Sequence, residues 1–404
     1  MDGPKLIGVD EALSNILSRA VHVDSSESVS LTDSLGRVLA ENYYVLNDVP
    51  PADNSAVDGY AIRKEDVRAG TPLRVSDRVP AGTPPRPFQL GTAVRIFTGS
   101  EIPEGVDAVV MQERVERSGN NIFIHADVTS GQNIRRRGQD LARGDLALAK
   151  GTRIRPQEIG LLASIGVNRV LVQKRLKVAV LTTGDELVEP GQPLVSGQIY
   201  NTNRFTLMGL LAEAGCEVVL CETLEDDRDA SRQILQKAAA ESNLVITSGG
   251  VSVGEEDHIR TALEESGKLL LWRLAIKPGK PLAFGEVAGT PVLGLPGNPA
   301  AVLVTFMVLA MPYIRKLQGR PELFAVGERL PALFSNDLPS IRREFVRARK
   351  QVNGDEPVVA AYPNQSSGML SSACWASGLA VVPENTAVKS GDFVTFYSFS
   401  ELLS

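Results

Sequence analysis

Residues 244–257 read LVITSGGVSVGEED, an apolar run that leads into a glycine-rich loop and then into three carboxylates. The run 244–247 has the length and composition of a buried strand. Three glycines in the next seven residues leave backbone N–H groups open to bind an anion, and the carboxylates beside them could bind a cation. The segment therefore predicts a phosphate site with a metal. An ordinary turn into a helix is the alternative, because carboxylates also suit the positive end of a helix dipole.

The composition is that of a multidomain globular protein. The chain has 404 residues, more than one core supports, so about two to four domains are expected. Hydrophobic residues make up 43% and charged residues 22%, which is ordinary for a globular chain. The net charge of -6 argues against a nucleic-acid binder and against a protein held on an anionic membrane. Any anionic ligand must therefore be bound by local donors.

Cysteines, histidines and apolar segments set further limits. The three cysteines have no metal-ligand spacing and are too few for a disulfide framework, which suits a reducing cytoplasm. The three histidines are scattered, so a zinc site built from histidine is not expected. The N-terminus lacks the pattern of a secretory signal. The longest apolar stretch, 300–311, is too short to span a bilayer and predicts a buried helix.

The N-terminal half predicts two units, one inserted in the other. Residues 9–19 have apolar side chains at helical spacing, and 156–165 look helical again before a short strand. Between them, prolines punctuate short alternating segments that are typical of a β-rich module. We therefore expect a discontinuous linking domain, residues 1–46 and 141–175, that carries an inserted β-rich module, residues 47–140.

From residue 176 strand-like and helix-like segments alternate, which predicts an α/β domain over 176–320. Strands are expected at 178–181, 217–220, 244–247, 269–272, 281–284 and 291–294, and helices at 203–214, 229–241, 257–265 and 299–317. Such alternation gives a doubly wound, mostly parallel sheet with ligands beyond the carboxyl ends of its strands. Residues 325–404 return to β-like segments and predict an appended β-barrel, with a sandwich as the alternative.

Polar groups follow five strands of the predicted sheet. The loops are TTGDE at 182–186, EDD at 225–227, the glycine loop at 248–257, KPGK at 277–280 and LPGNP at 295–299. Each alone is a common turn, but carboxylates gathered at one edge repel one another unless a cation joins them. Oxygen ligands favour magnesium, and the lysines could hold an anionic substrate. In the last loop Asn298 and Pro299 suit a helix start whose free N–H groups add another anion site. Together the loops predict phosphate-anhydride chemistry.

The inserted module carries a dense motif of its own, PADNSAVDGYA at 51–61. Its Asp-Asn pair suits an Asx turn, which leaves Asp58 as a carboxylate. A plain turn between strands is the alternative. The three arginines at 135–137, followed by Asp140, fit either a solvated charge run or an anion clamp.

Seven motifs in fixed order resemble one family over essentially the whole chain. They are DNSAVDGYA at 53–61, RIFTG at 95–99, QNIRRRGQD at 132–140, TGDEL at 183–187, SGGVSVG at 248–254, KPGKP at 277–281 and LPGNP at 295–299. The chain resembles the MoeA-type molybdopterin molybdenumtransferases, which are related to the E domain of gephyrin. Val57 stands where that family usually has Met. Arg273 stands where Lys is common, and it keeps the charge without the point geometry.

The resemblance implies an enzyme of the last step of molybdenum cofactor synthesis, with the molybdopterin-binding fold in its α/β domain. Such enzymes take adenylylated molybdopterin and molybdate, cleave the adenylyl anhydride with the help of magnesium, and release AMP as molybdenum is delivered. The resemblance also implies an elongated cytoplasmic homodimer whose cleft lies between the α/β domain of one subunit and the inserted module of the other. Contact with the preceding adenylyltransferase is expected as well.

Carried over by position, the family's catalytic residues fall in both halves of the chain. They are Asp58, Thr98, Asp140, Glu186, Asp226, Asp257, Lys277 and Lys280. Substrate-binding residues are expected in two loops: Ser248, Gly249, Gly250, Ser252, Gly254, Pro296, Gly297, Asn298 and Pro299. We expect Glu186, Asp226 and Asp257 to hold magnesium, while the glycine-loop amides cradle phosphate. Lys277 and Lys280 are expected to offset charge on the leaving AMP or to bind molybdate.

Two alternatives stand beside a molybdenumtransferase. The preceding adenylyltransferase shares the α/β unit, but it typically reads SGGTG in the glycine loop and lacks the inserted module and the C-terminal domain. A gephyrin-like scaffold without chemistry should show eroded carboxylates, yet Asp58, Glu186, Asp226 and Asp257 are all present. The enzyme is therefore the favoured hypothesis.

Overall fold

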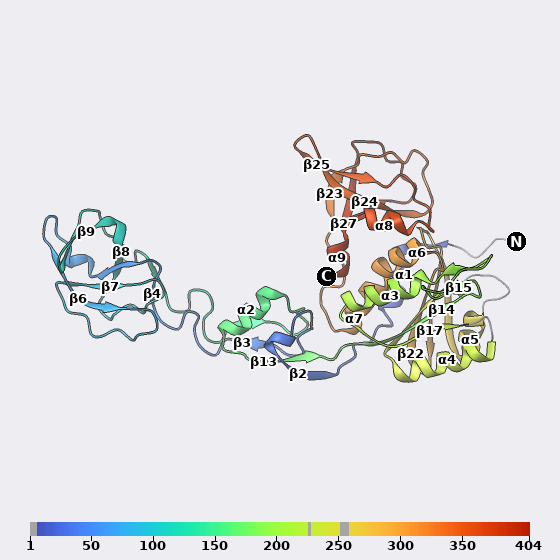
Figure 1. The fold of residues 1–404 in the computed structure, drawn as a ribbon, viewed down its shortest axis with the longest axis horizontal. Helices are drawn as coiled ribbons and strands as arrows, with labels where there is room; N and C mark the ends of the chain where they lie inside the picture. Colours follow the sequence, from blue (N-terminus) through green and yellow to red (C-terminus); the bar gives the residue numbers. More distant parts are fainter. Residues whose placement is uncertain (1–5, 225–227, 251–257) are drawn as a thin grey trace.

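The computed structural model describes residues 6–224, 228–250 and 258–404. These residues form an elongated molecule, with a β-rich module at one end and two packed units at the other, joined by a linking segment (Figure 1). The chain passes out through the linking segment to the module and returns before it enters the α/β unit. The predicted multidomain α/β plus β class is confirmed.

The α/β unit is built on a seven-stranded sheet in the order β1-β19-β21-β22-β18-β14-β17. The strands are β1 (Leu6–Ile7), β14 (Lys177–Thr183), β17 (Glu217–Leu224), β18 (Leu244–Ser248), β19 (Gly267–Leu274), β21 (Pro281–Val287) and β22 (Thr290–Leu295). Neighbours from β22 to β17 run parallel, whereas β21 runs antiparallel to β19 and β22. Only Ala288 and Gly289 join β21 to β22, which is too short for the crossover that a parallel pair needs. The sheet is thus mostly parallel, as predicted, with one reversed strand.

Alternate residues of β14 enter two separate cores, which explains its continuous apolar sequence. Val178 and Val180 pack with α1 (Val9–Leu17) and α3 (Thr202–Glu213) on one face. Ala179 and Leu181 pack with α4 (Arg228–Glu241) and α5 (His258–Ser266) on the other. A strand buried on both faces is what a doubly wound sheet requires.

One long helix lies in the core beside this sheet. It consists of α6 (Pro299–Thr305), a π-helical segment (Phe306–Ala310) and α7 (Met311–Leu317). The π segment lies just before Pro312, whose ring would clash with a carbonyl of the preceding turn in a regular helix. By length and composition this helix could cross a membrane, but 83% of its most apolar stretch is buried inside the protein, as in a core helix.

The N-terminal strand and helix pack with the α/β unit. β1 pairs in parallel with β19, and Val9, Ala12 and Ile16 of α1 are buried in the same core as α7. The apolar face of α1 is thus buried against the sheet of the α/β unit and not within the linking segment.

The linking segment consists of two small sheets and a helix. These are β2 (Ser26–Ser30) with β13 (Arg169–Gln173), β3 (Tyr43–Tyr44) with β12 (Leu146–Leu148), and α2 (Pro156–Ser164).

The β-rich module contains a six-stranded sheet in the order β8-β5-β7-β6-β10-β9. Its strands are β5 (Gly59–Ile62), β6 (Leu73–Val79), β7 (Thr92–Ile96), β8 (Ala108–Met111), β9 (Val115–Ser118) and β10 (Asn121–Ile124). Two apolar clusters pack on it, one around Tyr60 and Ile122 and one around Ala61 and Ile96. A short pair, β4 (Asn54–Ser55) and β11 (Ile134–Arg135), lies where the module meets the linking segment (Figure 1).

The C-terminal unit is a closed β-barrel. Its strands pair in the order β23 (Glu328–Pro331), β27 (Phe393–Ser398), β26 (Gly378–Val382), β24 (Arg343–Asn353) and β25 (Glu356–Ala361). A bridge between Ala332 and Val359 returns β25 to β23. Side chains such as Val346, Ala348 and Phe396 fill the interior, and α8 (Leu370–Trp375) and α9 (Phe399–Leu403) complete the unit. Closure of the sheet favours the predicted barrel over the sandwich.

An ion pair joins α1 to the barrel. Arg343 Nη1 and Nη2 each donate to Asp10 at 2.8 Å, and this hydrogen bonding lowers the pKa of Asp10 below 3.8. Because the Asp10 side chain keeps 75% of its exposure, we expect Asp10→Asn to lower the free energy of unfolding by only about 0.5–1 kcal/mol at neutral pH. The folded-state pKa is depressed, so the contribution is present above pH 3.8 and is lost as the pH falls through the lowered value. Chemical denaturation at neutral and acidic pH tests this, and a difference that persists in acid would contradict it.

Candidate active site

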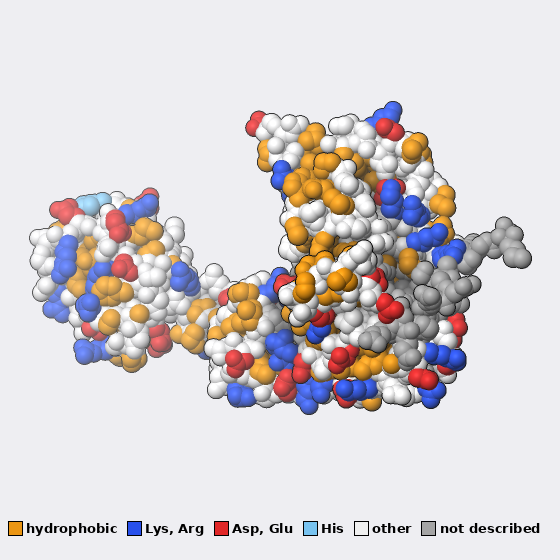
Figure 2. All heavy atoms as spheres, turned by 45° about the vertical axis from the view of Figure 1, so that its right-hand side comes forward, with side chains coloured by type: hydrophobic (Ala, Val, Ile, Leu, Met, Phe, Trp, Pro, Cys, Tyr) orange, Lys and Arg blue, Asp and Glu red, His pale blue; other side chains and the backbone are white. Residues whose placement is uncertain are grey.

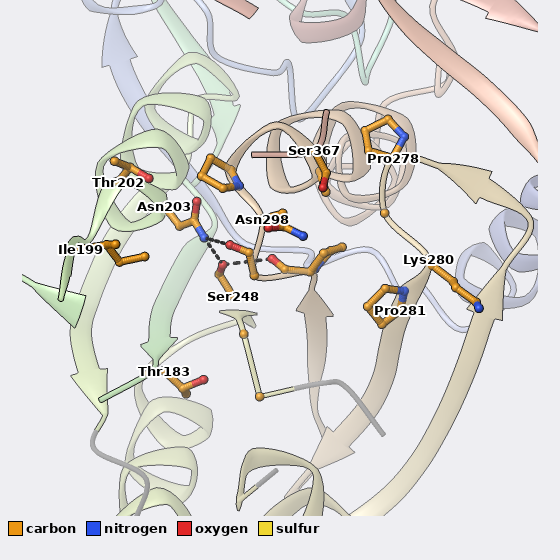
Figure 3. Close-up of a pocket in the computed structure, with 18 of the residues that line it drawn as sticks. Thr183, Ile199, Thr202, Asn203, Ser248, Pro278, Lys280, Pro281, Asn298 and Ser367 are labelled. Carbon is orange, nitrogen blue, oxygen red and sulfur yellow. Dashed lines mark hydrogen bonds between the residues drawn. The ribbon is translucent and has the colours of Figure 1, made fainter. Parts of the chain in front are cut away.

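A cavity of about 910 Å³ opens at the carboxyl ends of β14, β18 and β22, between the α/β unit and the C-terminal barrel (Figure 3). The three strands are parallel neighbours, so their ends meet at one edge, where ligands bind in such sheets. The starts of α3 and α6 also line the cavity, through Thr202 and Pro299. Because free N–H groups and the dipole make a helix start attractive to anions, the cavity is suited to an anionic ligand.

Every described residue that the sequence predicted for a site in the α/β unit lines this cavity. These residues are Glu186, Ser248, Gly249, Gly250, Lys277, Lys280, Pro296, Gly297, Asn298 and Pro299. Four further predicted residues, Asp226, Ser252, Gly254 and Asp257, lie outside the described residues. Loops that are far apart in the sequence thus meet at one place.

The glycine at the end of β18 is required by a close backbone approach. Gly249 has a φ of +86°, and a Cβ there would lie 2.8 Å from Thr183 Oγ1 and 2.9 Å from the Thr183 carbonyl oxygen. Both the positive φ and the contact exclude a larger side chain. The end of β18 can therefore lie against the end of β14 only because residue 249 is glycine.

A side chain that the sequence did not single out ties the loops to α3. Asn203 Nδ2 donates to Ser248 Oγ at 2.9 Å and to the Gly297 carbonyl oxygen at 2.6 Å (Figure 3). Ser248 Oγ in turn donates to the Pro296 carbonyl oxygen at 3.2 Å, and Ser248 is 2% exposed. Asn203 lies in the first turn of α3, where an asparagine is unremarkable as sequence. Only the fold reveals that it reaches two other loops.

Basic side chains stand at the side of the cavity next to the barrel. Lys277 belongs to the short strand β20 (Ile276–Lys277), which pairs with β24 in the register Lys277 to Glu344. Its Nζ lies 3.0 Å from Glu344 Oε2, and Glu344 is 8% exposed. Lys280 and Arg342 also line the cavity. Figure 2 shows Lys and Arg side chains gathered along the junction of the two units.

The barrel supplies a wall that the sequence did not predict. Gln365, Ser366 and Ser367 line the cavity, and the Ser367 carbonyl oxygen accepts a hydrogen bond of 2.9 Å from Ala300 N at the start of α6. Arg347 is 1% exposed and donates to the Ser366 carbonyl oxygen at 2.8 Å. Burial lowers the pKa of Arg347. The sequence around these residues has no motif that would mark a site. They lie beside the cavity because the barrel packs against the α/β unit.

Three predicted catalytic residues lie elsewhere in the chain. Thr98 donates to Asp58 Oδ1 from its backbone N and from its hydroxyl, both at 2.8 Å, and these hydrogen bonds lower the pKa of Asp58. Asp140 is exposed in the return from the module, where its N donates to the Val49 carbonyl oxygen at 3.0 Å. None of the three lines the cavity, and the module lies at the far end of the molecule (Figure 1). Within one chain, therefore, these three residues do not meet the predicted site residues of the α/β unit that the structure describes.

Two of the three arginines at 135–137 form ion pairs within the chain. Arg136 Nη1 lies 2.6 Å from Asp53 Oδ2, and Arg137 Nε pairs with Asp48. Hydrogen bonds from the backbone N of Arg143 and the side chain of Arg137 lower the pKa of Asp48. Hydrogen bonds from the backbone N of Arg137 and the side chain of Arg136 lower the pKa of Asp53. The pairing favours a structural role for this segment over an anion clamp.

Three carboxylates were expected to hold magnesium, and only Glu186 falls in the described part of the chain. Within residues 6–224, 228–250 and 258–404, no group of three or more His, Cys, Asp or Glu side chains is arranged to hold a metal ion. Glu186 lies at the cavity, on the loop between β14 and the short pair β15 (Leu187–Val188) and β16 (Ile199–Tyr200).

The chain matches known proteins over nearly its full length. The MoeA N-terminal region (domain I and II) matches residues 7–166, a probable molybdopterin binding domain matches 179–316, and the MoeA C-terminal region (domain IV) matches 329–399. The molybdopterin molybdenumtransferase of Haemophilus influenzae is 39% identical over 98% of this chain and 100% of its own length. That of a Nostoc species is 40% identical over 76% of this chain and 72% of its own. The crystal structure of the molybdopterin biosynthesis MoeA protein from Pyrococcus horikoshii OT3 covers 98% of this chain and 100% of its own, with a TM-score of 0.84 at 32% identity.

The α/β unit has its cavity at the carboxyl ends of its parallel strands and matches a probable molybdopterin binding domain, which places it in the class of molybdopterin-binding proteins. The N-terminal and C-terminal regions narrow this class, because both match regions of a single family. The chain belongs to the MoeA family of molybdopterin molybdenumtransferases. The match to these regions argues against the adenylyltransferase alternative, and the relatives' names, which are those of enzymes, argue against the scaffold.

Proposed function

We propose that this chain inserts molybdenum from molybdate into adenylylated molybdopterin at the cavity between the α/β unit and the barrel. The observation that carries this proposal is the convergence of the glycine loop after β18, the 277–281 turn and the start of α6 on one cavity. Open N–H groups and basic side chains suit the phosphates of an adenylylated substrate and a molybdate anion. The name that the relatives share, molybdopterin molybdenumtransferase, supports the transfer of molybdenum to molybdopterin.

The residues at the cavity would act mainly through charge. The backbone amide of Gly250 and those of Gly297 and Asn298 would bind oxyanions of the substrates, whereas the N–H of Gly249 already donates to the Leu295 carbonyl oxygen at 3.3 Å. Lys277 and Lys280 would offset the negative charge that develops on AMP as the anhydride is cleaved, an interaction that is stronger in the transition state than before it. The barrel wall and the α/β loops together would hold the two substrates in place.

Magnesium is proposed as the metal that assists. Glu186 would hold it together with Asp226 and Asp257, because carboxylate oxygens are the ligands that magnesium prefers. When bound, the ion supplies positive charge that neutralises the phosphates.

The reaction is tested by the release of AMP from adenylylated molybdopterin by the purified chain in the presence of magnesium. Release that depends on molybdate is the expected result. No release, or hydrolysis at the same rate without molybdate, would contradict the proposal.

We further infer that two copies assemble to complete the site. Asp58 and Thr98 adjoin β5 and β7 in the module, which lies at the opposite end of the molecule from the α/β unit (Figure 1). The pair of β3 and β12 in the linking segment exposes Tyr44 at 52% and Leu146 at 49%, and Leu46 nearby at 70%. An exposed apolar patch of this kind marks an interface. A second copy on this patch would bring the module of one subunit to the cavity of the other.

We expect the wild-type chain to sediment as a dimer and Leu46→Glu to weaken the dimer at least about tenfold, because a charge would be buried at the interface. Analytical ultracentrifugation over a range of concentrations measures this. Leu90→Glu is the matched control, since Leu90 is 68% exposed in the distal module, outside the patch. A monomeric wild type, or equal dissociation of both variants, would contradict the inference.

A cytoplasmic location and a contact with the preceding adenylyltransferase complete the proposal. The three cysteines Cys216, Cys221 and Cys374 are all free, which suits a reducing compartment. Direct transfer from the adenylyltransferase would keep the reactive anhydride away from water.

A further inference from the structure

Two successive peptide groups at the start of α6 are held by their carbonyl oxygens. The Pro296 carbonyl oxygen accepts from Ser248 Oγ at 3.2 Å, and the Gly297 carbonyl oxygen accepts from Asn203 Nδ2 at 2.6 Å (Figure 3). Asn203 Nδ2 also donates to Ser248 Oγ at 2.9 Å, so both carbonyls face one small cluster. The donor and acceptor roles are fixed, because an inverted Asn203 amide would set its oxygen against the Gly297 oxygen.

This anchoring determines where the N–H groups of the same peptides point. Both peptide bonds are trans, and in a planar trans peptide the N–H points opposite to the carbonyl. The N–H groups of Gly297 and Asn298 therefore face away from Ser248 and Asn203. Both residues line the cavity, and neither N–H has a hydrogen-bond partner within the described residues.

The cluster holds this orientation at a cost. Asn203 Oδ1 is buried and has no partner in the described part of the chain, which is unfavourable for an acceptor. The amide nevertheless keeps its two donated hydrogen bonds, because those bonds fix the adjoining loop. Ser248 has almost no exposed surface and does not itself offer its hydroxyl to a ligand, since that hydroxyl already donates to Pro296.

We propose that Asn203 and Ser248 are positioning residues that aim the N–H groups of Gly297 and Asn298 at a tetrahedral oxyanion of the substrates. Two N–H groups held in advance on one side of a loop bind an anion without reorganisation when it arrives. The inference rests on the proposed function and deepens it. The oxyanion is either a phosphoryl group of adenylylated molybdopterin or molybdate, which share this chemistry.

The test compares the wild type with Asn203→Ala, Ser248→Ala, their double variant and Asn203→Asp. Asn203→Asp is nearly isosteric and suits the first turn of a helix, so α3 should remain folded while both donated hydrogen bonds are lost. Asn203→Ala removes the same bonds without adding a charge that would itself repel an anion. Steady-state AMP release is measured while each substrate is varied in turn, and thermal unfolding of each variant is recorded alongside.

We expect Asn203→Ala and Ser248→Ala each to raise KM for one substrate at least about tenfold, with a smaller change in kcat and a thermal midpoint close to that of the wild type. Asn203→Asp should raise KM likewise, but with a lower thermal midpoint, because its carboxylate faces the Gly297 carbonyl oxygen. A rise for molybdate assigns the N–H pair to molybdate, and a rise for adenylylated molybdopterin assigns it to a phosphoryl group. The double variant should be about as impaired as the worse single variant, because both residues act on one loop. Calorimetric titration with sodium molybdate and with inorganic phosphate gives a readout that does not depend on turnover.

Unchanged KM values and unchanged anion binding in Asn203→Ala and Ser248→Ala would overturn the inference, as would a fall in thermal stability alone. A wild type without AMP release would instead count against the proposed function. In that case the titrations with molybdate and phosphate would still decide whether the N–H pair binds an oxyanion.

Discussion

Replacement of Lys277 by alanine is expected to lower kcat/KM for molybdate-dependent AMP release by about 10²–10³-fold. Removal of one donor that stabilises charge in a transition state typically has an effect of this size. Lys277 lines the cavity, and its Nζ is held 3.0 Å from Glu344 Oε2 of the barrel. The substitution should also destabilise the fold, because it removes the ion-pair partner of the buried Glu344 carboxylate. We expect the free energy of unfolding to fall by about 1–2 kcal/mol. This is less than for a fully buried ion pair, because the Lys277 side chain is 42% exposed.

A second substitution separates the two effects. In Lys277→Ala/Glu344→Gln the buried carboxylate becomes a neutral amide, so the stability should recover to within about 1 kcal/mol of the wild type. The activity should stay low, because the charge of Lys277 is still missing. Activity is measured as AMP release, and stability by thermal and chemical unfolding. If activity returned together with stability, the role of Lys277 would be structural only.

Replacement of Gly249 by alanine is expected to damage both the fold and the activity. The backbone φ of +86° is strained for alanine, and the new Cβ would lie 2.9 Å from the Thr183 carbonyl oxygen, which cannot move without shifting β14. Strain of this kind costs about 1–3 kcal/mol. Because the strand ends of β14 and β18 form the floor of the cavity, we expect AMP release to fall at least about tenfold as the loops move apart.

Gly209→Ala is the matched control for this substitution. Gly209 lies in α3 and its φ is not positive. An alanine Cβ at residue 209 would have open space around it, with no described atom outside its own helix backbone within 4 Å. Alanine in a helix interior is more favourable than glycine by about 0.5–1 kcal/mol, so this variant should be at least as stable as the wild type. Scanning calorimetry of both variants measures the contrast. Equal stability of Gly249→Ala and Gly209→Ala would show that the close approach to Thr183 is not needed.

Much of the fold could be predicted because periodicity and turn residues are local signals. The strand at 244–247 is found at β18 (Leu244–Ser248), and the helix at 299–317 is found as α6, a π segment and α7. The reversal of β21 could not be predicted from alternation alone, since strand direction depends on how short a connection is. The packing of α1 against the α/β sheet could not be predicted either, because the pattern of an amphipathic helix does not identify the core that buries its apolar face.

The residues of the candidate site could be predicted where they lie in loops that directly follow strands. Ser248 and Asn298 meet at one cavity because the carboxyl ends of parallel strands share an edge, and Lys277 reaches it from β20, which pairs with β24 of the barrel. Asn203 and Ser367 reach the same cavity without any motif, through the start of a helix and through the packing of a separate domain. Such contacts join residues that are distant in sequence and have ordinary neighbours. They appear only when the units are placed in space.

We propose that molybdenum insertion takes place in the cavity between the α/β unit and the barrel. This is tested most directly by following AMP and the molybdenum-bearing product together, in the wild type and in Lys277→Ala/Glu344→Gln, with adenylylated molybdopterin, molybdate and magnesium. The wild type should form both products in equal amounts and only when molybdate is present, and the folded double variant should form neither at a comparable rate. AMP release that does not require molybdate, or a double variant as active as the wild type, would contradict the claim.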